Sequence, residues 1–205
     1  MKRVISVLDV GIGNIASVTK TLDHLGADYK ICTCREDIVG AQMIIFPGVG
    51  NFSQASKILI NKDLRSIIRQ EVLIHKVPFL GICLGMQLIA EWGFESGKSR
   101  GLGLIDAIVE KIPKVNDIKI PHIGWNDVIH SGSGLMAGIP DGSDFYFVHS
   151  YRMSVNDPTV VNYFTSYGSE ITAYLEHGNI FGVQFHPEKS QQNGLKLIKN
   201  FIDLC

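Results

Sequence analysis

Short apolar runs and stretches with helical spacing follow one another in a regular order through the first half of the chain. Short apolar runs predict buried parallel strands, and they lie at residues 4–10, 29–33, 42–46 and 77–82. Residues 14–25 and 54–75 have the spacing of helices, and the first of these ends at Gly26. Because strands and helices alternate, the pattern predicts a doubly wound α/β fold with a central, mostly parallel sheet.

The second half of the chain has a different pattern. Its apolar runs are short and separated by turn residues, at positions 105–112, 126–129, 145–148, 160–166, 171–176 and 180–185. We expect these runs to form antiparallel strands added to the parallel sheet, with a helix at 193–204 that packs back onto it. The chain has no linker, repeat or low-complexity segment, so residues 1–205 are expected to form a single domain.

The strand at 77–82 continues into a helical pattern through Gly81-Ile-Cys83-Leu-Gly85. This G-x-C-x-G spacing is that of a nucleophile elbow, in which a sharp turn exposes the central side chain. Glycine suits both flanking positions because a Cβ there would clash with the neighbouring backbone. The start of a helix favours a thiolate over a thiol, and the Leu84 N–H would face an oxyanion. A cysteine can also be only a small core residue, so this pattern alone leaves both interpretations open.

Composition and charge exclude several classes of function. The net charge of -1 gives no positive surface for nucleic acid or anionic membranes. No apolar run is long enough to span a bilayer, and the N-terminal run is too short for a secretory signal, so a cytoplasmic protein is expected. Four cysteines in a chain of this size do not indicate a disulfide framework: Cys32, Cys34, Cys83 and Cys205. Cys32 and Cys34 have no second pair or nearby histidine, so they are interpreted as alternate strand residues and no metal site is expected.

Two glycine-rich turns follow predicted strands. Gly11-Ile-Gly13-Asn-Ile-Ala16 matches the spacing of a dinucleotide-binding turn, with Glu36 or Asp37 near the place of a ribose-binding acid. The same glycines also have a purely steric explanation, and we expect no cofactor. Pro47-Gly-Val-Gly50 lies at the carboxyl end of a strand, where its backbone N–H groups could bind an oxyanion, although an ordinary turn prefers the same residues.

A base for Cys83 lies in the segment 181–188. A strand ends at Phe185 and delivers His186 and Glu188, which an extended chain points the same way. A nucleophile with an adjacent base, itself oriented by a carboxylate, is the arrangement of a catalytic triad. Of the seven histidines only His186 has a carboxylate at a suitable spacing, whereas His122 and His149 lie in apolar surroundings and could be core residues.

The motifs together resemble the class I (triad) glutamine amidotransferases, and most closely the glutaminase subunits of imidazole glycerol phosphate synthase. The elbow and the His-Pro-Glu segment are typical of the whole class. The resemblance to this subunit family is carried by Asp9-x-Gly-x-Gly-Asn14, Pro121-His-Ile-Gly-Trp-Asn126, Phe147-Val-His-Ser-Tyr151 and the Lys-Ser that follows Glu188. The sequence departs from the family pattern at Val10 and at residues 92–96.

The resemblance implies a fold and a set of roles. The fold would be the single-domain class I amidotransferase (flavodoxin-like) fold. The substrate would be L-glutamine, with Cys83 as the nucleophile, His186 as the base and Glu188 as its orienting group. The oxyanion would be held by backbone groups of Val49, Gly50 and Leu84. The glutamine-binding residues would be Gln87, Glu95, Ser150 and Tyr151.

The resemblance also implies a partner. The ammonia would pass to a separate (β/α)₈-barrel cyclase subunit in a heterodimer, because this chain is too short to contain such a barrel. Residues that would meet the partner are Asn14, Pro121, His122, Trp125, Asn126 and Lys189, although Trp125 could equally be a core aromatic. Two alternatives stay open. The ammonia could serve a synthase that makes amidino-modified surface sugars, or the chain could act alone as a γ-glutamyl hydrolase.

Overall fold

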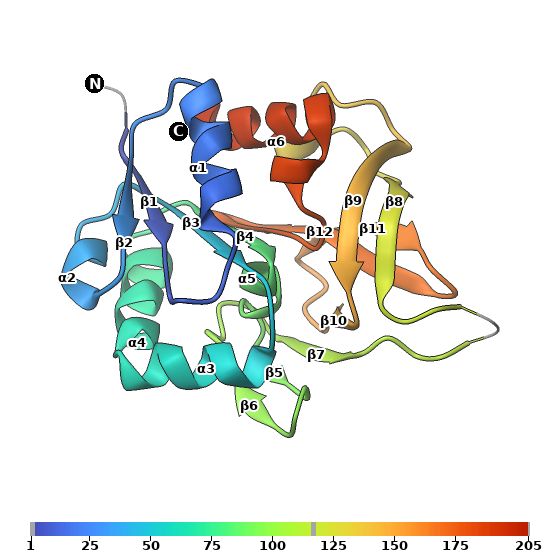
Figure 1. Ribbon diagram of the computed structural model, residues 1–205, viewed down its shortest axis with the longest axis horizontal. Helices are drawn as coiled ribbons and strands as arrows, with labels where there is room; N and C mark the ends of the chain where they lie inside the picture. Colours follow the sequence, from blue (N-terminus) through green and yellow to red (C-terminus); the bar gives the residue numbers. More distant parts are fainter. Residues whose placement is uncertain (1–2, 116–117, 205) are drawn as a thin grey trace.

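The computed structural model describes residues 3–115 and 118–204. In these residues the strands form a seven-stranded sheet, a four-stranded sheet and a two-stranded sheet. Helices cover both faces of the seven-stranded sheet, and the two smaller sheets lie beside it (Figure 1). Every helix in the described part of the chain is too short or too polar to cross a lipid bilayer.

The seven-stranded sheet has the strand order β11-β12-β13-β4-β3-β1-β2. Its parallel strands are β1 (Ile5–Leu8), β2 (Tyr29–Cys32), β3 (Met43–Gly48), β4 (Phe79–Cys83) and β13 (Ile180–Val183). The antiparallel strands β12 (Glu170–His177) and β11 (Val161–Ser166) extend it at one edge. The prediction of a mostly parallel sheet with added antiparallel strands is therefore confirmed. The orientation expected for the run at 180–185 was wrong, because this run forms β13 and pairs parallel with β4 inside the sheet.

The two faces of this sheet bury alternate residues of the same strands. In β3, Ile44 and Phe46 pack with α3 (Phe52–Asn61) and α4 (Leu64–Arg69), whereas Met43 and Ile45 pack with the opposite layer. That layer contains α1 (Ile15–His24) and the C-terminal helix α6 (Gln191–Asp203). A strand with both faces buried needs a continuous apolar run, which is the pattern that predicted β3.

The helical predictions differ from the structure in their lengths. The stretch expected at 54–75 is broken after Asn61, because Asp63 has a positive φ of 52°, and it continues through α4 into the π-helix η1 (Gln70–Ile74). The helix after the elbow, α5, is a single turn at Leu84–Gln87. The sequence analysis missed α2 (Arg35–Ile38), which is too short to have a periodic pattern. The remaining short turns are η2 (Gly134–Met136) and η3 (Pro187–Lys189).

Three runs expected in the central sheet belong to other sheets. Residues 105–112 contain β7 (Ala107–Lys111), which pairs with β10 (Tyr151–Val155) and β5 (Trp92–Gly93), and β6 (Ser99–Arg100) pairs with β5. The runs at 126–129 and 145–148 are parts of the hairpin β8 (His122–Val128) and β9 (Ser143–His149). The placement of these three runs in the central sheet was wrong, because an alternating pattern indicates a strand but not the strand with which it pairs.

The turn between β4 and α5 brings two backbones into direct contact. A Cβ on Gly85 would lie 1.8 Å from the carbonyl oxygen of Phe46 in β3, and one on Gly81 would lie 2.6 Å from the carbonyl carbon of Gly85. Neither distance is sterically allowed. Both flanking glycines of the elbow are therefore required by packing, as the sequence pattern predicted.

We expect Gly85→Ala to destabilise the protein by more than the ~3 kcal/mol that is common for overpacking, because the blocking atom is backbone and cannot rotate away. The control is Gly97→Ala, whose Cβ would meet no atom within 4 Å, so that only the backbone strain at its φ of 99° remains, about 1–3 kcal/mol. Urea unfolding followed by circular dichroism compares the two. Equal losses of unfolding free energy would show that the contact with Phe46 is not the cause.

Candidate active site

Cys83 lies at the carboxyl end of β4 with φ 53° and ψ -106°, a conformation that L-residues rarely adopt. Its Cα is in register with Gly48 at the end of β3, and β13 is the neighbour of β4 on the other side. Parallel strands present their carboxyl ends at one edge of the sheet. The elbow therefore lies between the 47–50 turn and the segment that carries His186.

His186 and Glu188 form a buried pair. His186 Nδ1 lies 2.7 Å from Glu188 Oε1, and the two side chains are only 1% and 2% exposed. The backbone also holds the histidine, since its N–H donates to the carbonyl of Tyr146 and its carbonyl accepts from the Ser190 hydroxyl. The ring thus has one fixed orientation, with Nδ1 toward the carboxylate and Nε2 free to act on the nucleophile.

Charge determines the protonation of His186. Burial by itself would lower the pKa of this ring, but the adjacent Cys83 sulfur and the Glu188 carboxylate favour the imidazolium and raise the pKa to about 10. An imidazolium that donates to Glu188 through Nδ1 has its second N–H at Nε2, beside the sulfur. The site therefore holds His186 as an imidazolium near neutral pH, with the Nε2–H available to the Cys83 sulfur.

A cavity of about 360 Å³ opens in front of Cys83. It brings together all the residues expected to bind the oxyanion and glutamine, from four separate segments. Its lining consists of Val49, Gly50, Cys83, Leu84, Gln87, Glu95, Pro121, Val148, His149, Ser150 and Tyr151. A concave site of this size with a few polar groups suits a small polar molecule.

Two of the expected glutamine-binding residues also have structural contacts. Gln87 Nε2 lies 3.1 Å from both the Tyr151 carbonyl and Gln184 Oε1, so its two N–H bonds are occupied and only its Oε1 is left for a ligand. Glu95 Oε2 accepts from the N–H of Phe52 at 2.7 Å, at the start of α3. Burial and, to a lesser extent, the Glu95 carboxylate raise the pKa of Tyr151.

Comparison with known proteins identifies the family. The profile of the family "Glutamine amidotransferase class-I" matches residues 6–204. The chain belongs to this family. Among its curated relatives, the "Imidazole glycerol phosphate synthase subunit HisH" of Moorella thermoacetica is 45% identical, over 98% of this chain and 95% of that protein. Subunit HisH 1 of Campylobacter jejuni (strain RM1221) is 43% identical, over 98% of this chain and all of that protein.

Solved structures confirm the amidotransferase fold. A glutamine amidotransferase from Thermotoga maritima superposes with a TM-score of 0.68, covering all of this chain and 84% of that one, at 19% identity. A chain of PurLQS from the same organism gives a TM-score of 0.76 at 18% identity, covering 100% and 99% of the two chains. At such low identities the likeness concerns the fold alone.

Sequence analysis of this amidotransferase missed two polar residues beside the nucleophile. Gln184 is fully buried and its Nε2 lies 3.7 Å from Cys83 Sγ. His149, which was considered only as a core residue, lies in the cavity wall. Strand alternation offered one signal, because Gln184 lies two residues before His186 and so shares its face. For His149 the sequence held no comparable signal.

The residues expected to meet the partner fall into three groups, which are exposed, buried and partly buried. Trp125 is 48% exposed and its ring lies 6.0 Å from that of Tyr146, so the interpretation as a core aromatic is wrong. Lys189 is exposed above the same tyrosine ring, and Pro121 is exposed at the cavity. The buried side chain of His122, only 2% exposed, does not fit the expected surface contact because it stacks between Phe147 and Tyr167.

Asn14 and Asn126 also have contacts within the chain. Both are partly buried. The Asn14 side chain caps α1 through the N–H of Ser17. Asn126 Nδ2 donates to the carbonyl of Ser166.

The alternative ligand motifs have local structural roles. The Asp37 carboxylate accepts from the backbone N–H groups of Thr33 and Cys34, and a Cβ on Gly13 would lie 3.3 Å from the Pro47 carbonyl. These contacts support the steric interpretation of the first glycine turn. The described cysteines, Cys32, Cys34 and Cys83, are free, and Cys205 lies outside the described residues. No group of three metal-binding side chains is found within residues 3–115 and 118–204.

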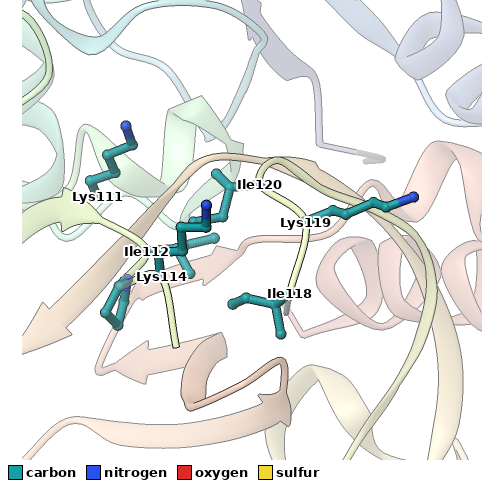
Figure 2. Close-up of a pocket in the computed structure, with 7 residues that line it drawn as sticks. Lys111, Ile112, Lys114, Ile118, Lys119 and Ile120 are labelled. Carbon is teal, nitrogen blue, oxygen red and sulfur yellow. The ribbon is translucent and has the colours of Figure 1, made fainter. Parts of the chain in front are cut away.

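A second hollow, of about 900 Å³, lies beside the loop after β7. Its lining is Lys111, Ile112, Pro113, Lys114, Ile118, Lys119 and Ile120. Figure 2 shows the ammonium groups of Lys111 and Lys119 extending in different directions, so these two lysines do not converge on a common ligand. The residues expected to bind glutamine line the smaller cavity at Cys83 and not this hollow.

We expect Glu188→Gln to lower the pKa of His186, because the variant keeps the side-chain size and removes the negative charge. The folded-state pKa lies above the ordinary value of 6.5. The imidazolium therefore stabilises the fold fully below about pH 6.5, and this contribution is lost as the pH rises through about 10. NMR titration of the His186 ring measures the pKa directly.

Unfolding experiments at increasing pH provide a second measurement. Between neutral pH and about 10 the unfolding free energy of the wild type should fall more than that of Glu188→Gln. In the NMR experiment the His130 ring, which contacts the Pro140 carbonyl and not Glu188, is the control. Its chemical shifts should be the same in the wild type and in Glu188→Gln. A His186 titration identical in both proteins would show that Glu188 does not hold its proton.

Proposed function

We propose that this chain is the glutaminase subunit of an imidazole glycerol phosphate synthase and hydrolyses glutamine to glutamate and ammonia. The observation that carries the proposal is the 40–45% identity to HisH subunits along almost the whole chain. The cavity at Cys83 supports it, because the residues expected to bind glutamine line the same cavity as the nucleophile. The reaction would take place in the cytoplasm, where a catalytic thiol stays reduced.

In the proposed first half-reaction the Cys83 thiolate attacks the side-chain amide carbon of glutamine. The carbonyl oxygen becomes an oxyanion, which backbone N–H groups of Leu84 and of Val49 or Gly50 would hold. The C–N bond then breaks while the His186 imidazolium gives its Nε2 proton to the nitrogen. Ammonia leaves, and the acyl group remains on sulfur as a thioester.

The second half-reaction restores the enzyme. Neutral His186 takes a proton from water, and the hydroxide adds to the thioester carbon. The C–S bond breaks, Cys83 leaves as the thiolate beside the regenerated imidazolium, and glutamate is released. Glu188 keeps the ring in position through both transfers, since its Oε1 lies 2.7 Å from Nδ1.

The proposed partner is a (β/α)₈-barrel cyclase that consumes the ammonia. Free ammonia would be protonated in water and lose its nucleophilic lone pair, so a direct passage between subunits is needed. Exposed apolar and basic side chains lie next to the catalytic segment, namely Ile123, Trp125 and Lys189. Trp125 and Lys189 lie against the ring of Tyr146, whose carbonyl accepts from the His186 N–H, so this surface is connected directly to the catalytic base.

A second acceptor is supported by the names of some relatives. HisH 2 of Pseudomonas aeruginosa and HisH 2 of Vibrio vulnificus, 41% and 42% identical to this chain, carry numbers that distinguish copies. Two glutaminases of one type in a cell can serve two different synthases. The alternative acceptor is an enzyme that makes amidino-modified surface sugars. Isolation of the complex from the source cell and identification of the bound chain decides between them.

We expect Cys83→Ala to abolish glutamine hydrolysis and to leave ammonia-dependent synthesis by the complex intact, because only the thioester step uses the sulfur. Trapping of the glutamine-derived thioester by mass spectrometry locates the nucleophile. Cys34→Ala, which changes an exposed cysteine outside the cavity, is the matched control and should keep wild-type turnover. A thioester on any other cysteine would overturn the assignment of Cys83.

We expect the isolated chain to be a poor glutaminase that the partner loaded with its acceptor activates. Val49 lies between Gly48 and Gly50, and the φ of 120° at Gly50 is available almost only to glycine, so a peptide in this turn can rotate at low cost. An oxyanion site that lacks one donor typically loses about 10²–10³ in rate.

Steady-state kinetics of the chain alone, with partner, and with partner plus acceptor analogue measure this activation. A rise in turnover of about 10²-fold or more with the loaded partner is the expected result. Equal turnover in the three conditions would favour the stand-alone γ-glutamyl hydrolase.

A further inference from the structure

Gln184 is placed between the nucleophile and the glutamine-binding wall. It follows β13 directly, its side chain is fully buried, and its backbone N–H donates to the carbonyl of Ala173. Its Nε2 lies 3.7 Å from Cys83 Sγ, within hydrogen-bonding distance for sulfur, and its Oε1 lies 3.1 Å from Gln87 Nε2. No part of it faces the cavity, so its polar contact with the reaction is through the sulfur.

The orientation of the Gln184 amide follows from its neighbours. The Tyr151 carbonyl can only accept, so the Gln87 atom 3.1 Å from it must be the amino nitrogen. That nitrogen uses its second N–H on Gln184, which must therefore present oxygen to Gln87. The Gln184 amino group is then directed at Cys83 Sγ, as a donor.

Two buried histidines continue the same chain of hydrogen bonds. His149 Nδ1 lies 2.8 Å from the Tyr151 carbonyl and must donate to it. Burial lowers the pKa of His149 to about 3, so the ring is neutral and its Nε2 is an acceptor. His122 Nδ1 donates to that nitrogen at 3.1 Å.

The chain of hydrogen bonds ends at Asn126, in the β8–β9 hairpin. Burial lowers the pKa of His122 to about 4, so His122 Nε2 accepts from Asn126 Nδ2 at 3.3 Å. From Asn126 to Tyr151 every donor and acceptor is thus fixed. The network allows a single arrangement of hydrogens, and such fully satisfied buried networks rigidify the groups they contain.

We propose that Gln184 is a further catalytic residue, whose side-chain N–H binds the Cys83 sulfur. His122 and His149 are then positioning residues, because their hydrogen bonds hold the Tyr151 carbonyl, and with it Gln87, in place beside Gln184. The inference rests on the proposed glutaminase role of Cys83. A donor at the sulfur stabilises the thiolate more than the neutral thioester. The contact therefore increases the reactive form of the free enzyme, and it assists departure of the sulfur when the thioester is hydrolysed.

Alkylation of Cys83 by iodoacetamide tests the contact without glutamine turnover. Gln184→Met keeps the length of the side chain and removes the donor. We expect alkylation at about pH 7 to slow by about tenfold, the low end for a hydrogen bond to a charged acceptor, with little change at about pH 9. A change in access to the cavity would instead slow both rates equally. Gln70→Met, at an exposed glutamine of η1, is the control and should alkylate like the wild type.

The positioning residues are tested by the ratio of the Cys83 alkylation rate at about pH 7 to that at about pH 9. His149→Phe removes both hydrogen bonds and should lower the ratio, and His149→Asn, which keeps a donor near the position of Nδ1, should restore most of it. His130→Phe changes another buried histidine, whose contact is to the Pro140 carbonyl, and should have no effect. Thermal melting followed by circular dichroism confirms that each variant is folded.

A folded Gln184→Met with a wild-type ratio of rates would overturn the proposal. If that variant does not fold, NMR of the wild type decides: the side-chain amide signals of Gln184 should move when Cys83 is alkylated, and those of Gln70 should not. Unmoved Gln184 signals would also overturn it. A chain that alkylates as expected but never hydrolyses glutamine, with or without a partner, would refute the proposed function and leave the contact in place.

Discussion

The contact between Gly85 and the Phe46 carbonyl is the constraint on which the site depends. Because α5 begins against the backbone of β3, the chain must turn from strand to helix within one residue. That residue is Cys83, and its positive φ is the result. The strain at this position is held by the packing of β3, β4 and α5, all of them buried, rather than by the cysteine itself. A nucleophile fixed in this way needs no reorganisation before it attacks.

Strand order supplies the groups around the nucleophile. β4 lies between β3 and β13, so the turn that begins at Pro47 and the segment that carries His186 reach the same edge of the sheet. The residues that meet there are about a hundred positions apart in sequence, as the Gln184–Cys83 contact shows with a separation of 101. Parallel strands make this convergence possible because every one of them ends at that edge.

Three buried histidines in this region have two different charge states, although burial disfavours the charged form of each. His186 has a carboxylate and a sulfur beside it, which together raise its pKa to about 10. His122 and His149 face carbonyl and amide groups or one another, and burial lowers the pKa of these two rings to about 4 and about 3. The neighbouring charges, and not the residue type, therefore decide that His186 can transfer protons, whereas His122 and His149 only hold other groups in place.

The sequence by itself determined what depends on close neighbours in the chain. The alternation of apolar runs and helices, the glycines around Cys83, and the His186-x-Glu188 spacing predicted the parallel sheet, the elbow and the pairing of His186 with Glu188, because each depends on a few consecutive residues. Only the tertiary structure decided which strands form the smaller sheets, that His122 is buried, that Glu95 also caps α3, and that Gln184 contacts the sulfur. Those features depend on pairing and burial between distant segments, and a local pattern of residues does not specify which distant segment will pack against it.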